Sequence, residues 1–282
     1  MTGSYGNNVY SEDSYKIPFT NSSGLILLEA EIEGQLGFFV FDTGADVTLF
    51  NKEALQFSDA QKLDLVPQPI STLTGTMQVG TATVSNIKLG NYVLNDLEVY
   101  HTDLSQIGDS VDGTLFGILG SNVFSSQVLH IDNVNRIIEL YDSQFLNRNA
   151  NANRYYKVPL EIVNDMILVP LTIGEKQYQF ALDTGSSVSL IDNKVLKENP
   201  DIHKLNKQLR INTANDQLST QAYEIGSSAL SQIKINSLQF GVADMSLFES
   251  MPDDFSGILS IEQLPFTELI IDFNNNLLHF SF

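Results

Sequence analysis

The feature that most constrains this chain is an internal duplication, because two copies of one pattern predict two copies of one fold. The segments Ile17–Phe19 and Val158–Leu160 begin the two copies at an offset of 158 − 17 = 141 residues. Thr43 and Thr184 keep that offset, since 184 − 43 = 141. Each copy ends with an Ile-Asp pair, an Asn-rich turn and a last apolar run.

A polar, Asn-rich stretch at 147–153 separates the copies and is typical of a linker. We therefore predict an N-terminal lobe at 1–147 and a C-terminal lobe at 148–282.

The spacing inside the copies predicts two differences between the lobes. Ile87–Leu89 resembles Ile233–Ile235, and the distance from the preceding Asp-Thr-Gly is longer in the second copy. We therefore expect a longer middle hairpin in the second lobe and a longer loop around 101–114 in the first.

Most of the chain is β-prone. The runs 26–32 and 166–173 are apolar, and each is followed by a short turn and a second apolar run that ends in an aspartate. Short helices are expected at Lys52–Leu55 and Asn193–Glu198. The fold class is all-β, with two similar lobes of antiparallel strands, a few short helices and a cleft between the lobes.

Two matching motifs carry the chemistry. Each lobe places an aspartate after a buried strand and follows it with Thr-Gly, at Asp42 and at Asp183. One Asp-Thr-Gly is common by chance, but two at matching places of a repeat are not. Two facing buried carboxyls can share one proton, the arrangement for which aspartic proteases are the standard example. The pair can then activate water and protonate a leaving amine.

The neighbouring motif residues have supporting roles. Gly44 and Gly185 allow a tight turn that brings backbone N–H groups to the carboxylates. Thr43 and Thr184 can donate hydrogen bonds across the lobe interface.

With these motifs the chain resembles the pepsin/retropepsin-type aspartic peptidases from about Ile17 to Phe282, with a first-lobe loop of bacterial or retroviral style. The resemblance implies a pepsin-like double barrel and an apolar-apolar-Gly element behind each catalytic loop. The first of these elements matches fully, whereas the second ends in serine: Ile118, Leu119 and Gly120; Ile258, Leu259 and Ser260.

The resemblance also implies roles for residues beside and above the aspartates. Ser186 would hydrogen-bond the outer oxygen of Asp183, while Ala45 offers Asp42 no such partner. The substrate flap of the family is a hairpin, for which the sequence offers two candidates. One is 74–80 with Gly75, Thr76 and Met77, and the other is 213–223 with Tyr223, an ordinary strand aromatic unless it replaces the tyrosine missing from the first flap.

Composition excludes several other functions. There is no cysteine, so disulfides, thiolate nucleophiles and cysteine-based zinc sites are excluded. A net charge of −19 repels phosphate backbones, so no nucleic-acid partner is expected. The four histidines lack metal-ligand spacing, and no Gly-x-Ser-x-Gly elbow or phosphate loop is present. We expect no cofactor and no metal.

The sequence thus predicts an aspartic endopeptidase that acts on peptide or protein substrates as a monomer, without an integral membrane span. An alternative is a catalytically weak or inactive peptide-binding or inhibitor module on the same fold, suggested by Ser260 and the missing flap tyrosine. No signal peptide opens the chain. The protein is therefore cytoplasmic if Met1 is native, and periplasmic, secreted or lipid-anchored if an export signal was removed.

Overall fold

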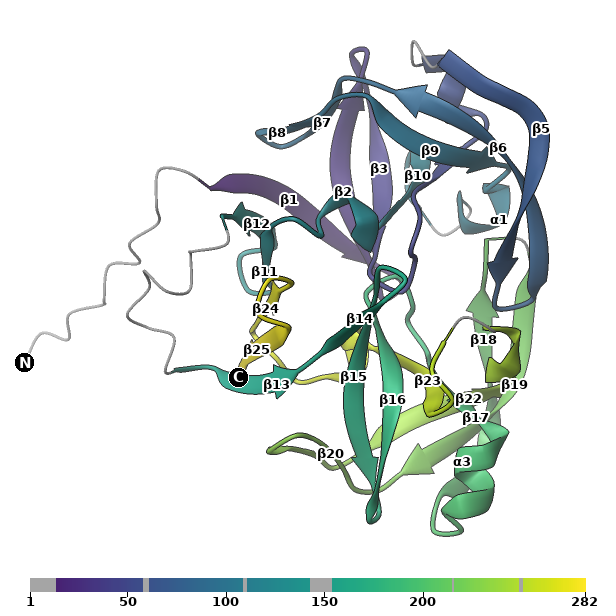
Figure 1. Cartoon of the computed structure of the whole chain (residues 1–282), viewed down its shortest axis with the longest axis vertical. Helices are drawn as coiled ribbons and strands as arrows, with labels where there is room; N and C mark the ends of the chain where they lie inside the picture. Colours follow the sequence, from purple (N-terminus) through teal and green to yellow (C-terminus); the bar gives the residue numbers. More distant parts are fainter. Residues whose placement is uncertain (1–13, 58–60, 109–110, 143–153, 215, 249–250) are drawn as a thin grey trace, which may run out of the picture.

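The computed structural model of the chain describes residues 14–57, 61–108, 111–142, 154–214, 216–248 and 251–282. The predicted lobe boundary and linker lie outside these residues. Figure 1 shows two β-rich lobes, one above the other, that are joined at one side by a shared sheet. No helix within the described residues is sufficiently long and apolar for a membrane span.

The first half of the chain forms most of a 15-stranded sheet. Its strands and short helices are β1 (Tyr15–Ser22), β2 (Leu25–Ile32), β3 (Gln35–Asp42), β4 (Leu49–Asn51), η1 (Ala54–Phe57), β5 (Gln61–Thr72), β6 (Gly75–Val84), β7 (Ile87–Leu89), β8 (Tyr92–Leu94), β9 (Leu97–Thr102), α1 (Ser105–Gly108), β10 (Leu115–Gly120), η2 (Ser121–Val123), β11 (Val128–Asp132) and β12 (Ile137–Tyr141).

The second half forms a 10-stranded sheet and adds three strands, β13, β24 and β25, to the first sheet. Its elements are β13 (Tyr156–Pro159), β14 (Glu161–Val163), β15 (Met166–Ile173), β16 (Lys176–Asp183), β17 (Ser189–Asp192), α3 (Asn193–Glu198), β18 (His203–Asn212), β19 (Gln217–Ile225), β20 (Ser228–Leu230), β21 (Ile233–Ile235), β22 (Leu238–Ala243), η4 (Met245–Leu247), β23 (Phe255–Ser260), η5 (Ile261–Gln263), β24 (Glu268–Asp272) and β25 (Leu277–Ser281).

The predicted all-β class and the two hairpins that end in aspartates are confirmed. β3 and β16 lack the alternation of a half-exposed strand because each runs between two neighbours beneath a packed core. Phe39 and Phe180 are fully buried in that core, where Phe39 packs against Phe50 and Phe180 against Phe240. The helix expected at Asn193–Glu198 is α3, capped by Asp192. The first expected helix is a 3-10 turn, η1, two residues later.

The two halves are more alike than the spacing suggested. β7 pairs with β2 at Glu31↔Lys88, and β20 pairs with β15 at Thr172↔Ala229. The offset of 141 therefore holds here, since 172 − 31 = 141 and 229 − 88 = 141. The predicted match of Ile87–Leu89 with Ile233–Ile235 is wrong, because the counterpart of β7 is β20.

Both predicted length differences disappear with that correction. The last cross-strand pairs of the middle hairpins are Ser71↔Thr76 in the first half and Asn212↔Gln217 in the second. These pairs are also 141 residues apart, so the second hairpin is not longer at its tip. β9 likewise starts 141 residues before β22, so the loop around 101–114 is not a first-lobe insertion. Short Ile-Lys-Ile-type triplets recur in β proteins, and this one gave a false match.

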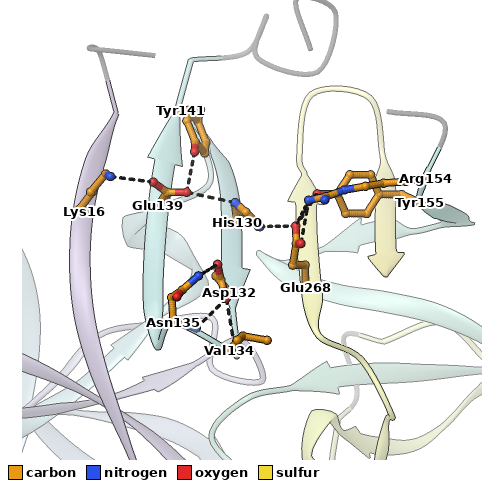
Figure 2. A network of polar contacts seen from close by, with 10 residues as sticks. All are labelled: Lys16, His130, Asp132, Val134, Asn135, Glu139, Tyr141, Arg154, Tyr155 and Glu268. Atoms are coloured by element: carbon orange, nitrogen blue, oxygen red, sulfur yellow. Dashed lines mark hydrogen bonds and ion pairs between the residues drawn. The ribbon is translucent and has the colours of Figure 1, made fainter. Parts of the chain in front are cut away.

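The shared sheet joins the halves through β11 and β24, which pair from Val128↔Asp272 to Asp132↔Glu268. Figure 2 shows that a chain of charged side chains crosses this junction. His130 lies between two carboxylates, with its Nδ1 3.3 Å from Glu139 and its Nε2 3.1 Å from Glu268. Arg154 lies 2.6 Å from Glu268 at one end, and Lys16 lies 3.5 Å from Glu139 at the other.

The charges in this network stabilise one another. Burial opposes the charge on His130, but Glu139 and Glu268 outweigh burial and raise the pKa of His130 to about 9. The hydrogen bond from His130, with help from Tyr155 and Arg154, lowers the pKa of Glu268 to about 2. Asp132 and Asp272, which begin the two Asn-rich turns, instead accept hydrogen bonds within those turns, as predicted.

Candidate active site

The two aspartates lie at equivalent strand ends. β10 runs parallel to β3 and brings Gly120 beside Asp42, while β23 runs parallel to β16 and brings Ser260 beside Asp183. The same strands pair antiparallel with β4 and β17, so each aspartate ends a central, three-sided strand arrangement. This position fixes the backbone of each carboxyl from both sides.

The glycines that follow are required by the opposite carboxyl. A Cβ at Gly44 would lie 2.7 Å from the carboxyl carbon of Asp183, and one at Gly185 would lie 2.3 Å from that of Asp42. The backbone N–H of Gly44 donates to Asp42 at 2.8 Å, and that of Gly185 donates to Asp183 at 2.7 Å. Each glycine thus leaves room for one aspartate and holds the other.

The two threonines lock the loops together, as predicted. The hydroxyl of Thr43 donates to the carbonyl oxygen of Leu182 at 2.6 Å, and that of Thr184 donates to the carbonyl oxygen of Phe41 at 2.7 Å. The backbone N–H of each threonine in turn donates to the other hydroxyl, at 2.9 and 3.2 Å. Both threonines are 1% exposed, so these four bonds are protected from water.

Burial raises the pKa of both aspartates. The pKa of Asp183 is raised well above its ordinary value, first by burial and then by the nearby negative charge of Asp42. The pKa of Asp42 is raised less, because the backbone N–H of Gly44 and a hydrogen bond from Asp183 oppose the effect of burial. The pair therefore holds one proton on Asp183 and one charge on Asp42.

Ser186 has a different partner from the one expected. Its hydroxyl donates to the carbonyl oxygen of Val188 at 2.8 Å, and Asp183 receives the backbone N–H of Ser186 instead. Asp42 receives the backbone N–H of Ala45 in the same way. The asymmetry predicted from Ser186 and Ala45 is therefore wrong in its cause, because backbone groups do the same work in both loops.

Ser260 is accommodated by a one-residue exchange of hydroxyls. In the first half, Gly120 leaves no room for a Cβ, and the hydroxyl of Ser121 donates to the carbonyl oxygen of Ala45 at 3.1 Å. In the second half, the hydroxyl of Ser260 itself donates to the carbonyl oxygen of Ser186 at 2.5 Å. Since 186 − 45 = 141, the two bonds hold equivalent carbonyls. Serine at this place supports the second loop and does not disturb it.

A cleft of about 1210 Å³ opens above the aspartates. One wall belongs to the first half, where Ile70, Leu49 and Ile118 are part of an apolar cluster. The opposite wall belongs to the second half, where Ile211 and Ile258 are part of the equivalent cluster. The described charged residues that line the cleft are Asp42, Asp46, Asp183 and Arg210.

Both predicted flap hairpins cover this cleft, and their tips meet. Figure 1 shows β5 and β6 reaching down to β18 and β19 on the side opposite the shared sheet. The hydroxyls of Thr74 and Thr213 are 3.3 Å apart. Leu73 packs against the second-half cluster, and Ala214 packs against the first-half cluster, so each tip rests on the other lobe.

The predicted flap residues divide between the cleft and the core. Gly75 and Thr76 line the cleft, whereas Met77 is buried in the first-half cluster. Tyr223 pairs with Phe240 at the base of its hairpin and is not part of the described cleft lining, so it does not replace a flap tyrosine.

Three features escaped the sequence stage: the contact between hairpin tips, the cleft-lining Arg210 and the network around His130. The 141-residue offset relates Leu73 to Ala214 (214 − 73 = 141), so a stricter alignment of the repeats would have indicated the first. No sequence signal marks the other two.

The comparisons bear on the whole arrangement. The family model described as "Aspartyl protease" matches the chain twice, at residues 28–123 and 169–262. The chain belongs to the aspartyl protease family. The two matches contain the two Asp-Thr-Gly motifs, one in each, and a protease-like function in general follows from that membership. No curated protein matches the sequence significantly.

Proposed function

We propose that this aspartyl protease family member is an aspartic endopeptidase in which Asp42 and Asp183 activate a water molecule. The observation that carries the proposal is the contact between two buried carboxyls, both with raised pKa values, at the base of a cleft. Like charges this close cannot both ionise, so the pair supplies a base and an acid at one pH.

The proton positions define the steps. The ionised Asp42 accepts a proton from water as the water oxygen attacks the peptide carbonyl carbon. Asp183 donates its proton to the carbonyl oxygen, which gives a neutral tetrahedral diol. When the C–N bond breaks, the leaving nitrogen takes the proton that Asp42 had accepted, and Asp183 recovers its proton from the diol hydroxyl. Each carboxyl thus returns to its starting state.

The cleft suits an extended peptide. A peptide strand passing between the aspartates and the two hairpins can add backbone hydrogen bonds as an extra strand would. The two apolar walls around Ile70 and Ile211 favour apolar side chains near the scissile bond.

The test is digestion of a mixed peptide library across pH by the wild type and by Asp42→Asn and Asp183→Asn. We expect each variant to lose activity by at least about a thousandfold, since acid–base groups contribute about 10² to 10⁴. Asp46→Asn is the matched control, because Asp46 is a third carboxyl of the same cleft. Wild-type activity should fall as pH rises above the raised pKa of Asp183. Full activity of either dyad variant refutes the proposal.

The same experiment separates the alternative, a non-catalytic peptide binder. A wild-type protein that binds the transition-state mimic pepstatin but cleaves no library peptide at any pH is a binder. One of the two reasons for that alternative is weakened, because Ser260 supports its loop through the bond to Ser186.

A further inference from the structure

The cleft contains one cation in the part of the chain that the structure describes, and nothing in the proposed catalytic steps uses it. Arg210 lies on β18 of the second-half hairpin, two residues before the strand ends at Asn212. It lines the cleft together with Ile211, whose side chain packs into the second-half wall. Arg210 is itself exposed, so its guanidinium is open to a ligand.

Arg210 has no ionic partner among the described residues. Every described lysine, arginine or histidine ion pair involves another side chain: Lys16, Lys88, His130, Arg154 and Lys176. In a chain with 34 acidic and 15 basic residues, an arginine without a carboxylate at 4.0 Å or less is notable. A guanidinium left available in a cleft is suited to bind a carboxylate in a bidentate manner.

The repeat shows that this cation belongs to one side of the cleft only. The offset of 141 relates Arg210 to Pro69, since 210 − 141 = 69, and Pro69 is uncharged and is not among the described cleft-lining residues. The neighbouring positions Ile70 and Ile211 are equivalent and both pack on their walls. The two walls are therefore similar in apolar character and differ in charge.

The remaining cleft charges make this difference consequential. Asp42, Asp46 and Asp183 are all acidic, and the net charge of −19 repels an acidic peptide in general. An acidic side chain is consequently accepted only where a cation offsets this repulsion. Near Arg210 the cleft wall continues with Leu247, Phe248 and Met251, which favour an apolar neighbour.

We propose that Arg210 is a specificity-determining residue, which selects peptides carrying a glutamate or aspartate on the second-half side of the cleft beside an apolar residue. This inference rests on the proposed peptidase function for its substrate, but it makes a separate statement about charge. It predicts a preference at one peptide position and none at the position related by the two-fold repeat.

The test uses fluorescein-labelled peptides with a fixed apolar centre, in which Glu, Gln or Lys is moved along the sequence. We expect the wild type to cleave the Glu peptide about three- to tenfold more efficiently than the Gln peptide at one position, as for a partly exposed charge pair. Arg210→Glu should reverse the order, so that Lys exceeds Glu at that same position. Arg210→Lys should keep the preference for Glu in weaker form.

The control is Lys204→Gln, which removes a cation from the same strand outside the cleft lining. It should leave the position and size of the Glu preference unchanged. A wild type with no preference for Glu at any position, or an Arg210→Glu variant with an unchanged preference, overturns the inference.

A binding arm separates this inference from the proposed function. Peptide affinities are measured by fluorescence anisotropy in the Asp183→Asn background, where cleavage is not required. Tighter binding of the Glu peptide that weakens with salt and reverses in Asp183→Asn/Arg210→Glu supports the inference even if the wild type cleaves nothing. Equal binding of Glu and Lys peptides, or no binding of either, overturns it even if cleavage is observed.

Discussion

Replacing His130 with glutamine should change how stability depends on pH. The side chains of His130 and Glu268 are 10% and 18% exposed, so solvent screens their ion pair little. The pKa of His130 in the folded protein is about 9, against 6.5 ordinarily. A difference of this size corresponds to about 3 kcal/mol of folding free energy.

The sign follows from the direction of the pKa change. His130 binds its proton more tightly when folded, so its contribution is complete below pH 6.5 and is lost as pH rises through about 9. The pKa of Glu268 is lowered from 4.5 to about 2, so its contribution is complete above pH 4.5 and is lost as pH falls through about 2. The network therefore stabilises most between pH 4.5 and 6.5.

The assay is unfolding by denaturant and by heat at a series of pH values. Between pH 6.5 and 9.5, the wild type should lose about 3 kcal/mol more than His130→Gln, or about 5 °C in Tm for a chain of this length. His203→Gln serves as the control, because His203 is an exposed histidine on β18. Wild-type and His130→Gln curves that stay parallel across this window would refute the reasoning.

Three further substitutions test the loops and hairpins. Thr184→Val removes the donor to the carbonyl oxygen of Phe41 and should lower the free energy of unfolding by about 2–4 kcal/mol in denaturant titrations, whereas Thr184→Ser should retain most of it. Leu73→Ala should speed amide hydrogen exchange at both hairpin tips by about tenfold, and unchanged exchange would contradict the tip contact. Ser260→Gly should destabilise by about 1–2 kcal/mol in thermal unfolding because it removes the bond to Ser186, and a stabilised variant would show that serine is a defect here.

Local signals made much of the site predictable. Each Asp-Thr-Gly follows an apolar strand in equivalent repeats, so the sequence indicates both the pair and the short turns beneath it. The hydrogen bonds of Thr43 and Thr184 follow from the same repeat, because two-fold related loops must meet face to face. These are contacts between residues that share one pattern.

Contacts that depend on side-chain direction were less accessible. Whether the hydroxyl of Ser186 turns to Asp183 or to Val188 depends on the local backbone, which composition does not reveal. The role of Ser260 required knowing that Ser121 holds the equivalent carbonyl from the next residue. His130 meets Glu268 across 138 residues of chain, through a strand pairing that no local pattern announces.

The threonine bonds between the loops are reciprocal, since Thr43 reaches Leu182 and Thr184 reaches Phe41. Reciprocity of this kind is the rule for an isologous dimer, in which two identical subunits each give and receive the same contact. Here both partners are parts of one polypeptide, so the contact forms at the effective concentration of an intramolecular encounter. Dilution that would dissociate a dimer cannot separate Asp42 from Asp183. Because the two halves are encoded separately, each can also diverge without altering the other, as Arg210 and Pro69 have done.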